Sequence, residues 1–294
     1  MHMVRIAPRL VVLGLLTAGI QTPASAEHRQ RASTPAEVTI PFNPPTDAVL
    51  TYRYSATDPR EEHPGPHSFD MNVTFARAGE YYVMTVVAPV PPGLPDEMAA
   101  LIQRPFSVRL GPDGEMIGIV DEARFWAGVD QVTQTITDAN VRQATATLVA
   151  RMRALPPDEL LPMISRSFAP IIASAGAELP IGEMSPPDEE RESVAGRMTM
   201  HSRVLVEVLD ADRAQITIVG TIPPEQLSGA MSGLFRDLAP PGATSFTGFE
   251  DRQTSIVSRR TGLAESWVSA RTVTIEWNGA PQTVVQTREL HWVH

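Results

Sequence analysis

The residues with the plainest chemistry are two histidines in a stiff loop. His63 and His67 flank the segment 64–66, which is Pro-Gly-Pro. Paired imidazoles can bind zinc or copper, but a complete site needs further ligands. Those would have to come from the nearby carboxylates Glu61, Glu62 and Asp70. Because this ligand set is incomplete, we predict an exposed loop with incidental histidines and no metal site.

Nucleophilic chemistry is limited by two absences from the sequence. The chain contains no cysteine and no lysine, so all 24 basic residues are arginine. A cysteine nucleophile, a Schiff-base lysine and a phosphate-loop lysine are therefore excluded. The segment 228–233, Ser-Gly-Ala-Met-Ser-Gly, has the wrong spacing for a nucleophile elbow and lies in a predicted helix. We predict no catalytic residue and no cofactor.

Acidic residues offer the remaining route to catalysis. Asp188, Glu189 and Glu190 could in principle form the carboxylate pair of a glycosidase. They lie in the proline-rich stretch 179–192, where we expect a solvated connector. The formal net charge is −10, and no basic stripe is visible, so nucleic acid is not an expected partner. The sequence favours a protein that is not an enzyme.

The first 26 residues have the features of a signal peptide. Arg5 and Arg9 precede the apolar run 10–20, and Ala24-Ser25-Ala26 is a small-residue cleavage site. We expect export to a periplasm and cleavage after Ala26; an uncleaved N-terminal anchor is the alternative. No later run of 18 apolar residues exists, so no stable transmembrane segment is expected after cleavage.

Glycine turns organise the predicted strands. In the C-terminal third, Thr261-Gly262 and Asn278-Gly279 separate runs rich in Val, Ile, Thr and Trp, and Asn-Gly is the strongest short hairpin signal. Before them, the polar, proline-dotted segment 27–45 is predicted to be a flexible lead-in. Strands are expected at 49–54, 69–76, 81–87, 106–110, 115–120, 197–209, 213–222, 254–259, 266–277 and 283–292.

The apolar period changes to that of a helix at residue 121. Apolar residues spaced four, three and four apart predict one helix, or two that meet near residues 138–140, and a further helix starts near Asp158. A short helix is expected to begin at Pro224. We therefore predict an α+β fold: a single domain, 46–294, in which a curved, half-barrel-like antiparallel sheet is covered by a helical insertion, 121–175.

This element order resembles two groups of bacterial proteins. The turn 258–263, Ser-Arg-Arg-Thr-Gly-Leu, is similar to turns in exported β-rich proteins of uncharacterised function and in the half-barrel superfamily of periplasmic lipoprotein carriers. The resemblance covers most of 49–293 in element order. It implies a lipid-carrying function, and we transfer no binding residue from it.

The predicted helices carry more apolar side chains than a single stripe requires. In one interpretation they line an apolar cleft and bind a ligand; in the other they complete an ordinary core. We accordingly predict a non-catalytic periplasmic protein that binds or carries a lipid, an acyl chain or a lipidated protein. The alternative is a structural or interaction protein of the cell envelope. The candidate ligand-binding residues are Phe125, Trp126, Phe168, Leu227, Met231 and Phe235.

Overall fold

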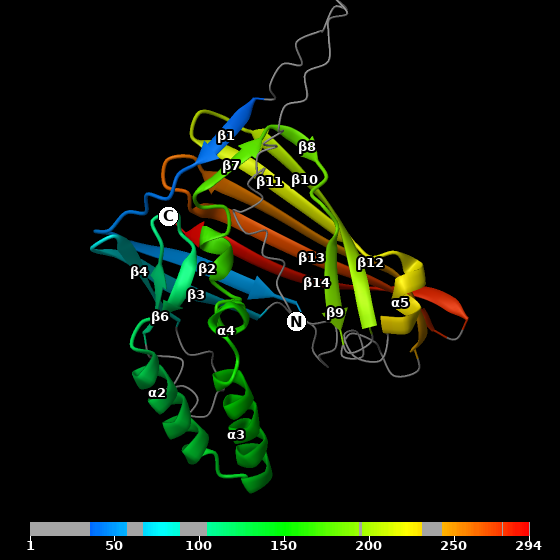
Figure 1. Ribbon diagram of the computed structural model, residues 1–294, viewed down its shortest axis with the longest axis horizontal. Coiled ribbons are helices and arrows are strands. Elements are labelled where there is room, and N and C mark those ends of the chain that lie inside the picture. The colour runs from blue at the N-terminus through cyan, green and yellow to red at the C-terminus, as the bar shows by residue number, and fades with distance from the viewer. Residues whose placement is uncertain are drawn as a thin grey trace, which may run out of the picture.

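The structure is dominated by antiparallel sheet (Figure 1). It is a computed structural model, and it describes residues 36–57, 67–88, 105–193, 196–230, 243–277 and 279–293. A 12-stranded sheet and a two-stranded sheet are accompanied, within these ranges, by four α-helices and one 3-10 helix. The predicted α+β class with an antiparallel sheet is confirmed.

The large sheet runs from β6 to β8 in the order β6-β5-β4-β3-β2-β14-β13-β12-β11-β10-β8, and β9 pairs with β10 off this path. Among the described strands β6 and β8 do not pair with each other, so the sheet is not closed into a barrel. Its strands are β2 (Val49–Ala56), β3 (His67–Ala78), β4 (Tyr81–Val87), β5 (Phe106–Leu110), β6 (Met116–Ile119), β8 (Gly182–Met184), β9 (Glu189–Ser193), β10 (Gly196–Val208), β11 (Arg213–Thr221), β12 (Ala243–Ser258), β13 (Ala264–Trp277) and β14 (Ala280–Val293).

One strand pair joins the two halves of the chain. Strand β2 pairs with β14, and Tyr54 lies opposite Leu290. The hairpins that precede the helices and those that follow them therefore belong to one continuous sheet, as the sequence predicts. Within the hairpins, Gly79 and Gly279 adopt the positive φ angles, 67° and 77°, that tight turns require.

One face of the large sheet forms the main core. We call it the inner face; it is the face that carries Tyr52, Met71, Phe75 and Leu290, each at most 1% exposed. The strands alternate apolar and polar residues, which places the apolar set on this side. Tyr52 Oη donates a hydrogen bond of 3.0 Å to the Ala264 carbonyl oxygen and so links β2 to the start of β13.

The helical insertion lies only partly on the sheet. Its elements are α2 (Glu122–Thr135), α3 (Ala139–Arg153), α4 (Pro157–Ile164) and the 3-10 helix η1 (Ala169–Ile172). Leu160 and Ile171, from α4 and η1, are buried in the core cluster with the inner-face residues. Helices α2 and α3 form a pair that extends away from the sheet (Figure 1). The helices therefore cover less of the sheet than the predicted insertion 121–175 suggests.

The predicted flexible lead-in, 27–45, is wrong for its described part, residues 36–45. Strand β1 (Glu37–Ile40) pairs with β7 (Ala177–Pro180) in the small sheet. Val38 and Ile40 are 1% and 0% exposed and pack in a second core cluster with strand residues such as Val206. The alternation in Glu-Val-Thr-Ile was too short to stand out beside the prolines, and burial against distant strands decides the conformation.

The predicted connector 179–192 also contains strands. It includes the end of β7, all of β8 and most of β9. Strands β8 and β9 are short and carry charged residues, as edge strands often do. Such strands lack the apolar alternation on which the sequence-based assignment depends.

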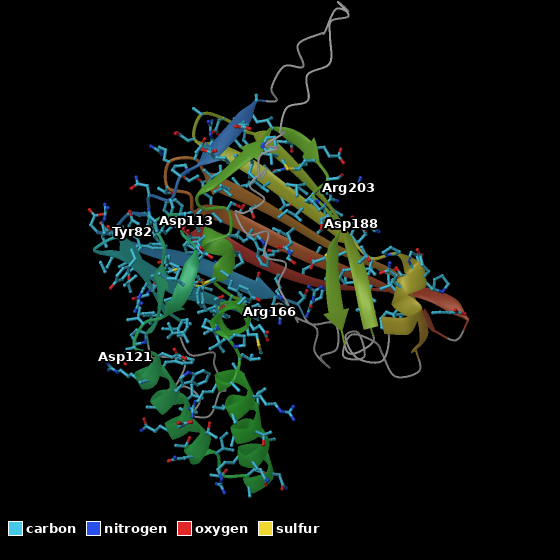
Figure 2. All side chains as sticks on the ribbon, in the orientation of Figure 1. Tyr82, Asp113, Asp121, Arg166, Asp188 and Arg203 are labelled. Carbon is cyan, nitrogen blue, oxygen red and sulfur yellow. The ribbon has the colours of Figure 1, made fainter. Side chains whose placement is uncertain are left out.

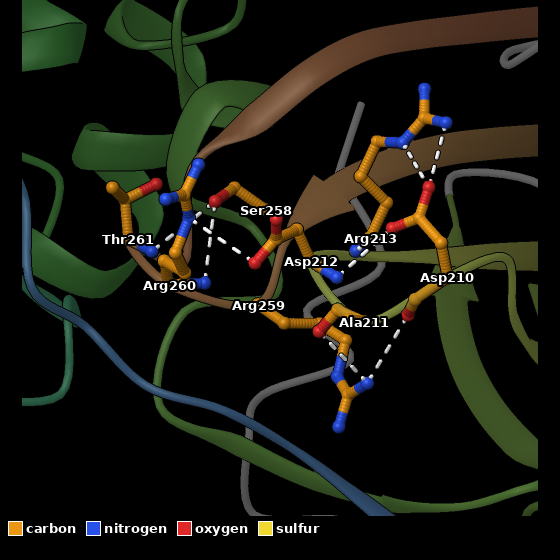
Figure 3. Close-up of polar contacts among 8 residues, drawn as sticks. All are labelled: Asp210, Ala211, Asp212, Arg213, Ser258, Arg259, Arg260 and Thr261. Carbon is orange, nitrogen blue, oxygen red and sulfur yellow. Dashed lines mark hydrogen bonds and ion pairs between the residues drawn. The ribbon is translucent and has the colours of Figure 1, made fainter.

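The turn 258–263 ties three parts of the chain together. Arg259 Nη1 donates to the carbonyl oxygens of Asp210 and Ala211 at 3.3 and 3.2 Å, so the turn contacts the β10–β11 connection (Figure 3). The Asn43 N–H donates to the Thr261 carbonyl oxygen at 3.0 Å, which anchors the N-terminal segment. These contacts give the turn a structural role.

Candidate functional site

Four aromatic side chains gather where the helices meet the sheet. The Phe106 ring, from β5, lies 5.3 Å from the Phe125 ring and 5.6 Å from the Phe168 ring, measured between centroids. The Phe125 and Trp126 rings are 4.9 Å apart. Three of the predicted site residues are thus brought together, and Phe106 joins them. We call these four residues the aromatic group.

Two side chains of the aromatic group are buried in the core, and the other two are partly exposed. Trp126 and Phe168 are 7% and 4% exposed, whereas Phe106 and Phe125 are only half-buried. Trp126 Nε1 donates to Glu122 Oε1 at 3.0 Å, and the Arg153 guanidinium lies over the Trp126 ring. These contacts fix the tryptophan, and the half-buried rings leave apolar area for a partner molecule.

The other predicted site residues do not join this group. Leu227 is fully buried on α5 (Pro224–Ala230), which packs against β10 and β12, and it is not part of the core cluster that contains the aromatic group. Met231 and Phe235 lie outside the described residues, as does His63. Asp188, from the acidic run 188–190, shares an exposed hydrogen bond with His201, with Oδ1 and Nδ1 2.7 Å apart.

A second, polar cluster lies on the inner face. Arg271 on β13 forms an ion pair with Asp251 on β12, with Nη2 and Oδ2 2.9 Å apart, and the two side chains are 17% and 10% exposed. Arg288 on β14 is on the same face, because it is two residues from the inner-face residue Leu290. Arg166 is half-buried and lies close after the end of α4 (Figure 2). We call Arg166, Arg271 and Arg288 the arginine cluster.

Burial and mutual repulsion perturb this cluster. Burial, followed by the positive charges of Arg166 and Arg271, lowers the pKa of Arg288 to about 10. Burial and the charge of Arg271 lower the pKa of Arg166 as well. Asp251 and Tyr54 act in the opposite direction on both arginines, but they do not offset the burial and the like charges. Burial and neighbouring like charges therefore disfavour the charged forms of Arg166 and Arg288.

Sequence reasoning missed the arginine cluster for a simple reason. In the sequence, Arg166 and Arg271 are 105 positions apart, and Arg271 and Arg288 are 17 positions apart. The only available signal was an arginine at an inward position of two neighbouring strands, Arg271 and Arg288. Recognising it requires the register of β13 against β14, which sequence alone gives only approximately.

None of the helices in the described part of the chain is both long enough and apolar enough to cross a membrane. No group of three or more His, Cys, Asp or Glu residues in the same ranges could hold a metal ion.

Comparison with known proteins identifies no family. No family model matches the chain, and no curated protein matches it. Among solved structures, the crystal structure of Rv2717c from M. tuberculosis is similar at 10% sequence identity and a TM-score of 0.24, covering 83% of this chain and 91% of that chain. A likeness of this size carries no argument about fold or function.

Proposed function

We propose that this protein is a non-catalytic periplasmic binder or carrier of an apolar ligand, namely a lipid, an acyl chain or a lipidated protein. The observation that supports the proposal is the aromatic group, whose rings Phe106 and Phe125 stay half-buried beside the buried Trp126 and Phe168. Burying apolar area gains about 25 cal/mol for each Å², so covering these rings with an acyl chain is favourable.

The location of the aromatic group suits a chain-like ligand. Phe106 belongs to the sheet, Phe125 to α2 and Phe168 to the segment between α4 and η1. An acyl chain seated here would contact strand and helix together. We further propose that the large sheet curves as a half-barrel around this junction, and that the leader 1–26 directs the protein to the periplasm.

A second candidate function is a structural or interaction protein of the cell envelope. It is favoured by exposed apolar side chains near one end of the sheet: Leu205, Val208 and Leu209 are 36%, 40% and 44% exposed on or just after β10. Strand β10 is next to β8, the last strand of the sheet order. Exposed apolar residues near a sheet edge are typical of protein contact surfaces.

Native mass spectrometry of the protein purified from its own periplasm tests the two functions. A retained lipid or acyl mass supports the first, and a retained protein subunit supports the second. We expect Phe125→Ala to lose the retained lipid mass. Leu148→Ala, a truncation at a 55% exposed apolar side chain on α3, should retain it.

The outcome that contradicts lipid binding is equally specific. If the protein carries no small-molecule mass, and dodecanol added at increasing concentration does not bind the purified protein, the proposed function is wrong. Equal loss of lipid in Phe125→Ala and Leu148→Ala would show that the aromatic group is not where the ligand binds.

A further inference from the structure

Helices α2 and α3 are fastened to each other by one arginine. Arg153 Nη2 on α3 donates to both carboxylate oxygens of Asp130 on α2, at 2.8 and 2.9 Å. The same guanidinium lies over the Trp126 ring of α2, 5.0 Å from the ring centroid. We call α2 and α3 together, residues 122–153, the helical pair. Because one side chain of α3 holds both a carboxylate and a ring of α2, we expect the helical pair to move as one unit.

The helical pair is attached to the main core at one end only. The side chains that it contributes to the core cluster come from residues 125–129 of α2 and 149–152 of α3. Among the described side chains, none from residues 130–148 belongs to this cluster. The far end of the helical pair is therefore free of the sheet, as its projection in Figure 1 shows.

The chain enters the helical pair through a strained residue. Asp121 lies between β6 and the first residue of α2 (Figure 2), and its φ and ψ angles are 50° and 58°. It is the only non-glycine residue with a positive φ in the part of the chain that the structure describes. Its Oδ1 accepts a hydrogen bond of 3.3 Å from the Arg124 N–H. Backbone strain of this kind is concentrated at sites that bind or switch, and residues at the ends of elements serve as hinges.

The chain leaves the helical pair through two prolines. Pro156 and Pro157 separate α3 from the body of α4, and neither has an N–H to continue the hydrogen bonds of α3. Helix α4 stays on the core, where Leu160 and Leu161 are 4% and 2% exposed. The helical pair therefore ends where the docked part of the insertion begins.

We propose that the helical pair is a lid over the aromatic group and tilts about Asp121 to admit an apolar ligand. This inference rests on the proposed function and adds how the ligand reaches its site. Phe125 moves with the lid, whereas Phe106 belongs to β5 and Phe168 follows the docked α4. The Phe106 and Phe125 ring centroids are 5.3 Å apart, so the lid is closed in this structure. An alkyl chain between these rings would require about 4 Å more, the contact distance of carbon atoms.

Two opposing contributions set the position of the lid. Burial of Trp126, which is 7% exposed, favours the closed position. The left-handed backbone at Asp121 favours the tilted position, because a change of φ at this residue releases its strain. A bound alkyl chain covers the apolar area that the tilt uncovers. The ligand therefore shifts the lid from the closed to the tilted position.

Distances between spin labels measure the tilt, and the absence of native cysteine allows labels at chosen positions. One double variant, Gln134→Cys with Ala76→Cys, joins the last turn of α2 to β3 through two exposed positions. A second, Gln134→Cys with Ala146→Cys, joins two exposed positions within the lid. When dodecanol is added, pulsed electron paramagnetic resonance should show the first distance change by about 4 Å or more. The second distance should stay constant.

Variants of Asp121 test the hinge, with dodecanol affinity measured by isothermal titration calorimetry. Asp121→Gly removes the strain of the closed lid, because glycine adopts a positive φ freely, and should weaken binding about threefold or more. Asp121→Ala increases the strain, because alanine lacks the oxygen that accepts from Arg124, and should strengthen binding by a similar factor. Both variants lose the same hydrogen bond, so a role in capping alone would change the affinity in one direction.

Asp138→Gly is the matched control. Asp138 Oδ1 accepts a hydrogen bond of 2.8 Å from the Asn140 N–H at the start of α3. The variant therefore also replaces an aspartate at the start of a helix by glycine, but it does so at the far end of the lid. Its affinity for dodecanol should equal that of the wild type.

The outcomes separate the lid from the proposed function. If dodecanol binds and the distance between lid and sheet does not change, the lid is wrong and the apolar ligand remains. If both distances change equally, the helical pair is not one unit and the lid is wrong as well. A change of affinity in the same direction in both Asp121 variants overturns the hinge. If dodecanol does not bind, both proposals are wrong.

Discussion

At the scale of single residues, Arg271 and Arg288 of the arginine cluster differ in their surroundings. Arg271 is paired with Asp251 across two adjacent strands, and both side chains are largely buried. Arg288 has a pKa lowered to about 10 because burial and neighbouring guanidinium groups penalise its charged form. Removing Arg271 leaves the buried carboxylate of Asp251 without its ion-pair partner, which destabilises the folded protein. Removing Arg288 lowers the repulsion between guanidinium groups.

Arg271→Gln and Arg288→Gln should therefore change stability in different directions. We expect Arg271→Gln to lower the free energy of unfolding by about 3 kcal/mol, because Asp251 loses its charged partner. Arg288→Gln should leave the free energy of unfolding unchanged or raise it. Urea unfolding at pH 7 measures both values, and an equal loss in the two variants would contradict the assignment.

Tyr52 predicts a specific dependence of stability on pH. Burial, and to a smaller extent the charge of Glu265, raise the pKa of Tyr52 above its ordinary 10.0. The unfolded chain therefore releases this proton first, and the stability that the neutral phenol contributes below pH 10 is lost as the pH rises above it. The loss reaches at most about 1.4 kcal/mol for each pH unit.

Tyr52→Phe isolates this effect. At pH 8 the variant should be less stable by about 1 to 2 kcal/mol, because the Ala264 carbonyl oxygen loses its hydrogen bond. At pH 11 the difference from the wild type should shrink by about 1.4 kcal/mol, since only the wild type has Tyr52 to ionise. Chemical unfolding at the two pH values measures the gap; a constant gap would contradict the raised pKa.

At the scale of elements, the turn between β12 and β13 can be recognised from its glycine in the sequence, and it also contacts a distant segment of the chain. Gly262 has a φ of 76°, and a Cβ there would collide with the Pro41 carbonyl oxygen. Gly79, in the β3–β4 turn, has a φ of 67°, yet a Cβ there would meet no described heavy atom within 4 Å. Both glycines have a left-handed φ, but only Gly262 has backbone atoms of another segment beside it.

Alanine at these two glycines should separate backbone strain from close approach. Gly79→Ala should cost about 1 to 2 kcal/mol of unfolding free energy, the price of a left-handed conformation with a Cβ. Gly262→Ala should cost about 3 kcal/mol or more, because the segment around Pro41 must also move. Urea unfolding compares them, and losses of similar size would show that the N-terminal segment does not press on this turn.

At the scale of the whole molecule, the projecting helices and the sheet share one core. Trp126 on α2 and Trp267 on β13 belong to the same buried cluster. Although α2 and α3 extend beyond the sheet, the base of α2 is therefore bound to it (Figure 1). Elements that share a buried cluster are expected to unfold together.

Fluorescence of single-tryptophan variants tests this cooperativity. With the other tryptophans replaced by phenylalanine, Trp126 and Trp267 should report the same denaturant midpoint, matching that from far-ultraviolet circular dichroism. An earlier transition at Trp126 alone would show that the helical pair unfolds independently of the sheet.

Whether a feature could be predicted from the sequence depends on how far apart in the chain its residues lie. The hairpins around Gly79 and Gly279 were predictable because a turn and its two strands are contiguous. Strand β1 was not, because Val38 and Ile40 are buried by strands more than 100 residues away. Of the residues predicted to bind a ligand, Phe125, Trp126 and Phe168 lie together with Phe106, which was not among them, and Leu227 lies elsewhere.

The amino-acid order by itself determined the turns, the alternation of each long strand and the helical period of 122–164, since these depend on neighbours within a few residues. Only the tertiary structure decided that β2 lies beside β14, that β1 closes a small sheet with β7, and that Arg271 and Arg288 lie on one face of neighbouring strands. Such pairings depend on packing and register between segments far apart in the chain, as the bond from Tyr52 to Ala264 across 212 positions illustrates.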